Sequence, residues 1–354
     1  MKNFTFDYMS PRVVFGAGSV SELADEVARL GSRRLLVLST PDQHNLARDI
    51  VRPVRDIVAG YFDRATMHVP VEIVAEAQRA FEETGADSVV AVGGGSTTGL
   101  AKILSLKLGV PSLVIPTTYA GSEMTTIWGV TEGGLKRTGR DSRVLPKTVI
   151  YDPLLTVGLP LPISVTSGLN AIAHAAEGLY SDELNPILET MCKQGIGALV
   201  DAIPQLAANQ ADVEARTEAL FGAWLCGTAL CHLGMGLHHK LCHTLGGTLN
   251  LPHAETHAVV LPHAMAYNLP SAPAARRLLQ GVVGDDDVPG ALYDLANRCG
   301  APLSLAEIGM RHEDIRVVRD LALQDQYPNP RPLERDALET LLSNAFDGRR
   351  PSIE

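Results

Sequence analysis

The histidines of this chain are concentrated in one stretch of its second half, where their spacing suits chemistry. That stretch holds six of the eleven histidines. His239 and His243 lie four residues apart, and His253 follows a proline ten residues later. Upstream, Asn170 and His174 have the same spacing of four, which places two side chains on one face of a helix. Two such helices facing each other could direct all five side chains into one site.

Four of these five side chains are histidines, which are common ligands in divalent-metal sites. Asn170, however, offers an amide at the position that suits a carboxylate. A neutral amide oxygen is a poorer ligand for a hard dication, so tight iron binding is disfavoured. Three histidines can still hold zinc, so the residues alone leave a metal site open. Histidines without a metal can instead protonate near neutral pH and bind anionic groups.

A glycine-rich segment in the first half has the composition of a phosphate-binding loop. Gly93, Gly94, Gly95 and Ser96 follow an apolar run and precede a stretch of helical character. Glycines allow a ligand to approach the backbone closely, and the N–H groups of a helix N-terminus suit a pyrophosphate. A tight turn without a ligand has the same composition. Lys102, six residues after Ser96, is either part of this site or a surface lysine.

Hydroxyl groups follow the next apolar run. Thr117, Thr118 and Ser122 come directly after it, and ligands bind at the carboxyl ends of strands in an open α/β sheet. Loop hydroxyls also cap helices, so this segment has two readings as well. The earlier segment 16–18 (Gly-Ala-Gly) lacks the third glycine of a dinucleotide fingerprint, and we interpret it as a structural turn.

The elements that must position these residues fall into two parts. Residues 1–160 alternate apolar runs with helical stretches, which predicts an α/β domain with a parallel, doubly wound sheet. Residues 161–354 are rich in Ala and Leu and predict an α-helical domain. Strands are expected at 12–15, 35–39, 61–68, 88–92, 112–116 and 148–151. Helices are expected at 20–30, 71–84, 98–108, 167–181, 186–207, 211–248 and 333–345.

Composition excludes several classes of protein. With 45% hydrophobic and 20% charged residues, the chain has the composition of a globular protein. A net charge of -10 argues against binding to nucleic acid or to an anionic membrane. The five cysteines form no CxxC pair, which indicates reduced thiols and a cytoplasmic location. No segment has the length of a signal peptide or of a membrane span.

Taken together, these motifs resemble the iron-containing alcohol dehydrogenase superfamily over nearly the whole chain. The resemblance rests on a GGGS loop with a lysine six residues later, a PTTxxxSE segment, and a helical part with HxxxH and PH. It implies an NAD(P)-binding α/β domain with a mostly parallel sheet and an all-α catalytic domain. The GGGS loop and the PTT segment then bind NADH or NADPH, and Lys147 matches a family lysine near the cofactor. The family also implies a homodimer.

The resemblance places the family's metal ligands at Asn170, His174, His239 and His253. His243 matches a histidine that lies near the nicotinamide and is not a ligand. Besides Asn170, two positions depart from the metal-dependent members. Gly99 stands where an Asp usually completes GGGSxxD, and Thr40 stands where many members hold the adenosine ribose with an Asp.

These departures resemble the maleylacetate reductase branch of the superfamily. Five segments carry the same resemblance: 93–102, 116–123, 167–180, 240–247 and 329–332. Members of this branch reduce the carbon–carbon double bond of maleylacetate to give 3-oxoadipate, in bacterial degradation of aromatic compounds such as resorcinol, hydroxyquinol and chlorocatechols. The branch implies function without a metal ion.

The chemistry of maleylacetate agrees with that implication. Hydride addition to the enone leaves an enolate, which hydrogen-bond donors or an imidazolium can stabilise without a metal. We expect His243 and His253 to be the main polar catalytic groups, one protonating the enolate and the other orienting the substrate, in either assignment. His174 and His239 either join them or are buried packing histidines.

The remaining polar residues receive weaker assignments. The two substrate carboxylates need cations, and the candidates, which the sequence does not rank, are Lys240, Arg137, Arg140 and Arg331. Thr40 lacks the charge that would repel a 2′-phosphate, so NADH and NADPH are both expected. His257 and His263 are interpreted as structural, with His238 pointing away from His239, and Cys242 as a core thiol.

Three other functions remain open. The first is a metal-dependent alcohol or polyol dehydrogenase of the same fold, which metal analysis would identify. The second is a non-catalytic nucleotide-binding protein, which turnover of maleylacetate would exclude. The third is a lyase of the dehydroquinate synthase type, against which the PTTxxxSE segment and the missing carboxylate argue.

Overall fold

The computed structural model describes residues 3–133, 135–324 and 327–353, which divide into two compact units. One unit runs from Tyr8 to Leu159, and the other begins at Pro160 and also includes the residues before Tyr8. The predicted division at residues 160 and 161 placed those first residues in the α/β domain. They group with the helical unit because Phe6 packs its ring against His232, with 5.3 Å between ring centroids.

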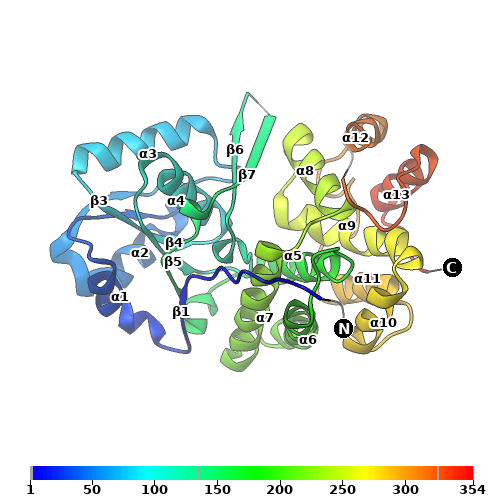
Figure 1. The fold of residues 1–354 in the computed structure, drawn as a ribbon, viewed down its shortest axis with the longest axis horizontal. Helices are drawn as coiled ribbons and strands as arrows, with labels where there is room; N and C mark the ends of the chain where they lie inside the picture. The colour runs from blue at the N-terminus through cyan, green and yellow to red at the C-terminus, as the bar shows by residue number, and fades with distance from the viewer. Residues whose placement is uncertain (1–2, 134, 325–326, 354) are drawn as a thin grey trace. The chain divides into compact units, whose positions relative to one another are not determined.

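A six-stranded parallel sheet forms the centre of the α/β unit (Figure 1). Its strands are ordered β1-β8-β5-β4-β2-β3. Their bounds are β1 Arg12–Phe15, β2 Leu35–Leu38, β3 Val58–Phe62, β4 Ser88–Gly93, β5 Ser112–Pro116 and β8 Thr148–Tyr151. Every residue of β2, β4, β5 and β8 is buried, which explains why these strands read as continuous apolar runs.

Helices cover both faces of this sheet, as Figure 1 shows. Their bounds are α1 Leu23–Leu30, α2 His44–Ile50, α3 Val71–Thr84 and α4 Gly95–Leu108. Alternate residues of a strand point to opposite faces, so β2 sends Leu35 and Val37 into one core and Leu36 and Leu38 into the other. The first core contains α1 and α2 and the second contains α3 and α4, which confirms the predicted doubly wound sheet.

The strand predicted at residues 61–68 is wrong in its extent. β3 ends at Phe62, and further along His68 and Val69 have φ angles of 64° and 47°. A strand cannot contain such angles, and a β-branched residue rarely adopts them. Thr131 holds this loop by donating from its backbone N–H to Val69 O and from its hydroxyl to His68 O, at 3.2 and 2.9 Å.

The α/β unit also contains an element that the sequence did not predict. Strands β6 Ile127–Glu132 and β7 Leu135–Arg140 form a two-stranded antiparallel sheet of their own. A bridge between Pro70 and Thr131 connects the hairpin to the loop before α3. The hairpin therefore supports the same strained loop that contains His68 and Val69.

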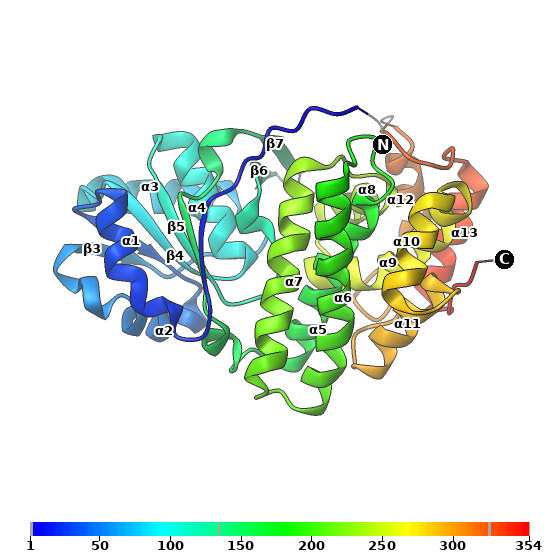
Figure 2. The same ribbon diagram turned by 60° about the horizontal axis from the view of Figure 1, so that its bottom comes forward.

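The helical unit is built around α5, which is buried from Ser164 to Gly178. Helix α5 packs against α6, α7 and α9, and Figure 2 shows α6 and α7 side by side. The bounds are α5 Leu161–Gly178, α6 Pro186–Ala208, α7 Val213–His232, α8 Leu237–Leu249, α9 His253–Asn268, α10 Pro273–Val283, α11 Val288–Arg298, α12 Asp314–Ala322 and α13 Arg335–Asp347. The predicted all-α architecture is confirmed.

The stretch 211–248, predicted as helical throughout, is broken into two helices. α7 ends at His232, α8 begins at Leu237, and the chain bends by 96° between them. Gly234 and Gly236 lie at the break, where glycine favours a change of backbone direction. Among the described residues no single helix is long and apolar enough to cross a membrane, and only this bent pair passes by length and composition.

Candidate functional site

Three polar side chains share one face of the buried helix α5. Asn170, His174 and Glu177 are spaced four and three residues apart and are 3%, 4% and 0% exposed. The Oδ1 atom of Asn170 has no hydrogen-bond partner among the described residues. An unpaired acceptor in a protein interior is costly, which is typical of a side chain that faces a ligand or an ordered water.

The carboxylate of Glu177 lies at the N-terminus of α8, where the chain bends. It accepts backbone N–H bonds from Gly236, His238 and His239, at 3.2, 2.9 and 3.2 Å. The hydroxyl of Tyr180 donates to the same carboxylate at 2.8 Å. Burial opposes ionisation of Glu177, but the hydrogen bond and the charge of His239 prevail and lower its pKa to about 2. Glu177 is therefore a buried anion that caps α8.

Glu177 also orients a pair of histidines. Nδ1 of His239 lies 2.6 Å from Oε2 of Glu177, and Nε2 of His239 lies 2.8 Å from Nδ1 of His174. Because a carboxylate can only accept, Nδ1 of His239 carries the proton of the first bond. Both ring nitrogens of His239 are thereby engaged within the protein. The sequence assigned His174 and His239 to the site, but did not identify Glu177.

The two histidines predicted to be catalytic lie at the same cluster and are partly exposed. His243 is on α8, with its ring centroid 6.2 Å from that of His239. His253 is the first residue of α9, with its ring centroid 4.5 Å from that of His257. Since Asn170, His174 and His239 are buried, His243 and His253 are the predicted residues most accessible to a substrate in this unit.

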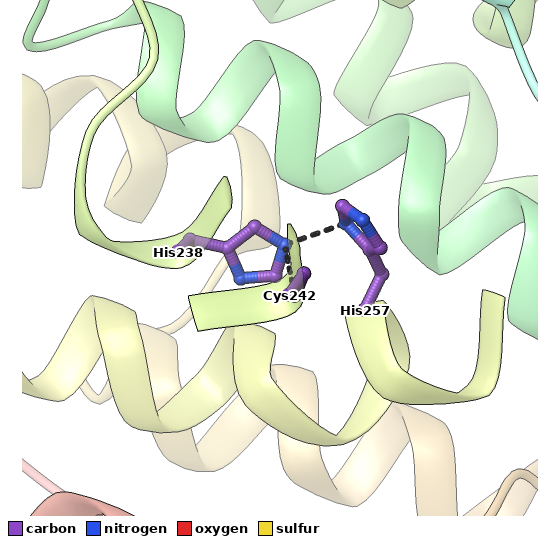
Figure 3. Close-up of side chains that lie close together, drawn as sticks. All are labelled: His238, Cys242 and His257. Atoms are coloured by element: carbon purple, nitrogen blue, oxygen red, sulfur yellow. Dashed lines mark hydrogen bonds between the residues drawn. The ribbon is translucent and has the colours of Figure 1, made fainter. Parts of the chain in front are cut away.

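A second cluster of side chains, fully buried, lies next to these histidines. Nε2 of His238 is 2.9 Å from Nδ1 of His257 and 3.7 Å from Sγ of Cys242, as Figure 3 shows. The ring of His257 also lies 5.1 Å from that of His239. Burial lowers the pKa of His238 to about 3 and places the pKa of His257 well below its usual value. The two imidazoles are neutral core groups, as predicted for His257, and Cys242 is a core thiol, as predicted.

His263 is the third histidine interpreted as structural. It is 3% exposed on α9, and burial lowers its pKa to about 4. Because His263 is not among the residues predicted to contact the substrate, it provides an internal reference for the site histidines.

The donor geometry does not fit the family's metal site. Its four positions are Asn170, His174, His239 and His253, and among the described residues these positions do not bring three His, Cys or carboxylate donor atoms within 4.8 Å of one another. Of the described residues, only His238, Cys242 and His257 place three His, Cys or carboxylate donor atoms within 4.8 Å of one another. That group lies outside the family positions, and its two imidazoles already bond to each other.

The glycine loop forms the other candidate site, in the α/β unit. Gly93 ends β4, Gly94 caps α4, and Gly95 begins the helix. A Cβ atom on Gly94 would lie 2.8 Å from Cγ2 of Thr118, whereas a Cβ on Gly95 would meet only ordinary contacts. The N-terminus of α4 is thus open beside Gly95 and Ser96, with unpaired N–H groups that suit a phosphate. The observed cradle fits a dinucleotide.

The PTT segment lies beside the glycine loop. The backbone N–H of Thr117 donates to Gly93 O at 3.1 Å, and Nε2 of Gln43 donates to Oγ1 of Thr117 at 2.7 Å. The buried Oγ of Ser122 has no partner among the described residues, so it offers a hydrogen bond to a ligand. Thr40 directly follows β2 and Ser39, at the same edge of the sheet. Gln43 was not identified from the sequence.

The structure gives Lys102 an internal role. It is 2% exposed, and its ammonium group donates to Ser122 O, to Oγ1 of Thr125 at 2.8 Å and to Ile127 O at 2.8 Å. An ammonium group has three N–H donors, and these bonds use all of them. Lys102 therefore holds the segment 122–127 in place, in contrast to the predicted direct contact with the cofactor.

Lys147 is contradicted as a cofactor residue. It lies exposed just before β8, and its backbone N–H donates to Ser112 O at the start of β5. Gly93 pairs with Pro116 at the end of β5, four residues further along. At about 3.3 Å per residue, Lys147 is roughly 13 Å from the ligand-binding edge. Lys147 is therefore an exposed charge at the start of a strand.

Gly99 is explained by its packing. A Cβ atom at this position of α4 would lie 2.8 Å from Cγ2 of Val69. Val69 is buried and belongs to the loop with positive φ angles. The side chain of Val69 thus occupies the space that an aspartate at position 99 would need.

The predicted cations have different surroundings. Arg137 pairs with Glu132 at 3.0 Å within the hairpin, and Arg140 is exposed. In the helical unit Arg331 stacks over Tyr267 at 4.3 Å, and Lys240 lies 5.8 Å above the ring of Tyr327. The latter two belong to the same unit as the histidines.

Comparison with known proteins covers the full chain. The family model described as "Iron-containing alcohol dehydrogenase" matches residues 10–153, and the model described as "Fe-containing alcohol dehydrogenase family, C-terminal" matches residues 164–346. Maleylacetate reductase 1 of Cupriavidus pinatubonensis is 78% identical over 354 residues, covering 100% of both chains. Maleylacetate reductase of Pseudomonas knackmussii is 56% identical over 99% of each chain. The crystal structure of maleylacetate reductase from Rhizobium sp. strain MTP-10005 has 50% identity and a TM-score of 0.93, covering 99% of this chain and 100% of that one.

Proposed function

The chain belongs to the iron-containing alcohol dehydrogenase family, and from this premise we propose that it is a maleylacetate reductase. The reaction is the reduction of the carbon–carbon double bond of maleylacetate by NADH or NADPH to give 3-oxoadipate. The observation that carries this function is the 78% identity to a maleylacetate reductase over the full length of both chains. The family resemblance places the reaction in the catabolism of aromatic compounds.

The two candidate sites correspond to the two reactants. The N–H groups at the start of α4, with Ser96, Thr118 and Ser122, are proposed to hold the pyrophosphate and the nicotinamide ribose of the cofactor. When bound, the nicotinamide supplies a hydride to the alkene carbon β to the ketone of the substrate. The histidine cluster is proposed to receive the substrate, with Lys240 and Arg331, the two predicted cations of the helical unit, as partners of its carboxylates.

The partly exposed histidines are proposed to handle the charge that the hydride leaves behind. Negative charge collects on the ketone oxygen as an enolate, and a proton must then reach the carbon α to the ketone. One of His243 and His253 stabilises the enolate and supplies the proton to that carbon, and the other orients the substrate. The unpaired Oδ1 of Asn170 is available to the same ligand or to a water beside it.

We propose that turnover needs no metal ion, although the family is named for iron. The amide at Asn170 supports this proposal, as does the lack, among the described residues, of three converging His, Cys or carboxylate donor atoms at the family positions. We expect that oxidation of NADH driven by maleylacetate keeps its rate after incubation with a chelator, and that the purified protein contains less than stoichiometric iron or zinc. Activity that disappears with the chelator and returns with added metal would instead identify a metal-dependent dehydrogenase.

The control for metal analysis is the buried group of His238, Cys242 and His257. If cobalt binds there, a sulfur-to-cobalt absorption band appears in the wild type and is lost in Cys242→Ser. A metal at the family positions would leave Cys242→Ser unchanged. The two locations are thereby distinguished even if the protein does retain an ion.

We expect Thr40→Asp to shift cofactor preference toward NADH. An aspartate after the strand accepts hydrogen bonds from the ribose diol and repels a 2′-phosphate. The ratio of kcat/KM for NADH to that for NADPH should rise by about tenfold or more, which corresponds to roughly 1.4 kcal/mol. Thr40→Ser keeps the hydroxyl without the charge and should leave the ratio unchanged. An unaltered ratio in Thr40→Asp would place the ribose elsewhere.

The homodimer stays a prediction of the family resemblance, and the cytoplasmic location stays a prediction from the cysteine content.

A further inference from the structure

We propose that Glu177 is the positioning residue of the His239–His174 pair. Its carboxylate keeps a proton on Nδ1 of His239, and thereby directs Nε2 of His239 toward His174. This inference rests on the proposed function only where it predicts an effect on turnover. The arrangement of protons is testable without any substrate.

The first argument is the number of donors that converge on this carboxylate. Oε2 accepts from the backbone of Gly236 and His239 and from the ring of His239, while Oε1 accepts from His238 N and from the hydroxyl of Tyr180. A carboxylate with these five donors is fixed in position and ionised. The His239 ring that bonds to it is fixed in turn.

The second argument is that the fold provides this position in a specific way. Glu177 is three residues after His174 on α5, and the bend between α7 and α8 brings the N-terminus of α8 onto it. A Cβ atom on Gly236 would lie 3.2 Å from Oε1 of Glu177, so a larger residue there would press on the carboxylate. The positive end of the α8 dipole further favours an anion at this point.

The third argument is a polar network that supports Glu177 from the other side. Asn268 donates to the hydroxyl of Tyr180 at 3.1 Å and exchanges two amide bonds with Asn329. Oδ1 of Asn329 also accepts from Leu237 N at 3.2 Å. Asn329 thus bonds to the start of α8, and the Tyr180 hydroxyl accepts from Asn268 while it donates to Glu177.

The consequence for the reaction is geometric. With Nδ1 of His239 held by Glu177, Nε2 lies 2.8 Å from Nδ1 of His174, and neither ring can turn without breaking a buried hydrogen bond. The rings of His174 and His239 are therefore held in fixed orientations. Asn170 lies one turn before His174 on α5, and the ring of His243 lies 6.2 Å from that of His239. A carboxylate that orients a metal-ligating imidazole typically contributes 10- to 100-fold to activity, and we expect a contribution of the same order from Glu177 without a metal.

The test compares Glu177→Gln with Tyr180→Phe. Glu177→Gln places an NH₂ group against N–H donors and removes the fixed acceptor of His239, whereas Tyr180→Phe removes one donor from the same carboxylate and leaves Oε2 intact. Nitrogen-15 spectra of histidine-labelled protein should show a protonated Nδ1 at His239 in the wild type and in Tyr180→Phe, and an altered His239 signal in Glu177→Gln. Assignment comes from His239→Asn.

The kinetic result should follow the spectra. We expect kcat for maleylacetate to fall by about 10- to 100-fold in Glu177→Gln with a small change in KM, and to stay within about threefold in Tyr180→Phe. Equal losses of kcat in the two variants would mean that Glu177 acts only on folding, which overturns the proposal. A bare Nδ1 at His239 in the wild type overturns it too, and needs no variant to fold.

Failure of the proposed function gives a different result. If the protein does not oxidise NADH with maleylacetate, the wild-type His239 signal and its change in Glu177→Gln still decide whether the carboxylate sets the proton position.

Discussion

Replacing either His243 or His253 with asparagine lowers kcat for maleylacetate by about 10²- to 10⁴-fold, the usual contribution of a positioned proton donor. The two rings are the partly exposed members of a cluster in which His174, His239 and His257 are buried. Only an accessible imidazole can reach the enolate oxygen or the carbon beside it. Asparagine keeps a hydrogen-bonding group of similar size but cannot transfer a proton.

The measurement is the steady-state rate of NADH oxidation with saturating maleylacetate. A loss in kcat with little change in KM is expected for the residue that protonates the enolate, and a larger rise in KM for the residue that orients the substrate. His263→Asn is the matched control, because this buried histidine should affect stability and not the rate per folded molecule. Wild-type rates in both variants would remove the assignment.

The second large effect concerns stability. Lys102→Met leaves Ser122 O, Ile127 O and the Thr125 hydroxyl without their shared donor inside the α/β unit. Ser122 O keeps the backbone N–H and the hydroxyl of Thr125 as donors, and the Thr125 hydroxyl keeps Ile127 N, so Ile127 O is the acceptor most affected. An unsatisfied buried acceptor costs roughly 1–3 kcal/mol, and we expect a loss of stability of about that size. For a unit of this size that corresponds to a fall in Tm of roughly 2–12 °C.

Lys107→Met provides the control for this experiment. Lys107 is in the last turn of the same helix but is exposed, so its replacement should leave Tm within about a degree. Thermal unfolding monitored by circular dichroism gives both values. A wild-type Tm for Lys102→Met together with weakened NADH binding would restore Lys102 as a direct cofactor ligand.

Much of the architecture was predictable because the local and global signals agree. The strands at 12–15, 112–116 and 148–151 match the structure residue for residue, as does the helix at 71–84. Buried parallel strands need continuous apolar runs, and these runs are bounded by turn residues in the sequence. The helical character of the second half was equally clear from its Ala and Leu content.

The failures occurred where tertiary contacts override local pattern. The strand predicted through His68 ends early because Thr131, sixty residues away in sequence, holds a loop with positive φ angles. The helix predicted across Gly234 and Gly236 breaks because the N-terminus of α8 is satisfied by Glu177, a partner that local sequence cannot reveal.

The candidate site shows the same division. Histidine spacing indicated His174, His239, His243 and His253, but the acceptor that orients them was overlooked. The signal was present: Asn170, His174 and Glu177 follow a spacing of four and three, which continues one helical face. The prediction for Lys147 rested on a motif match alone. It did not consider that Lys147 precedes the start of a strand, whereas ligands bind at the carboxyl ends of the strands.

The packing of Gly99 against Val69 makes these two positions dependent on each other during evolution. A mutation that restored the aspartate usual in metal-dependent relatives would collide with the valine methyl group before it could offer any benefit. A change at position 69 to a smaller residue, such as glycine, would have to come first, and it would also relieve the positive φ angle there. An aspartate at position 99 is therefore accessible only through an ordered pair of substitutions, in which the change at position 69 comes first.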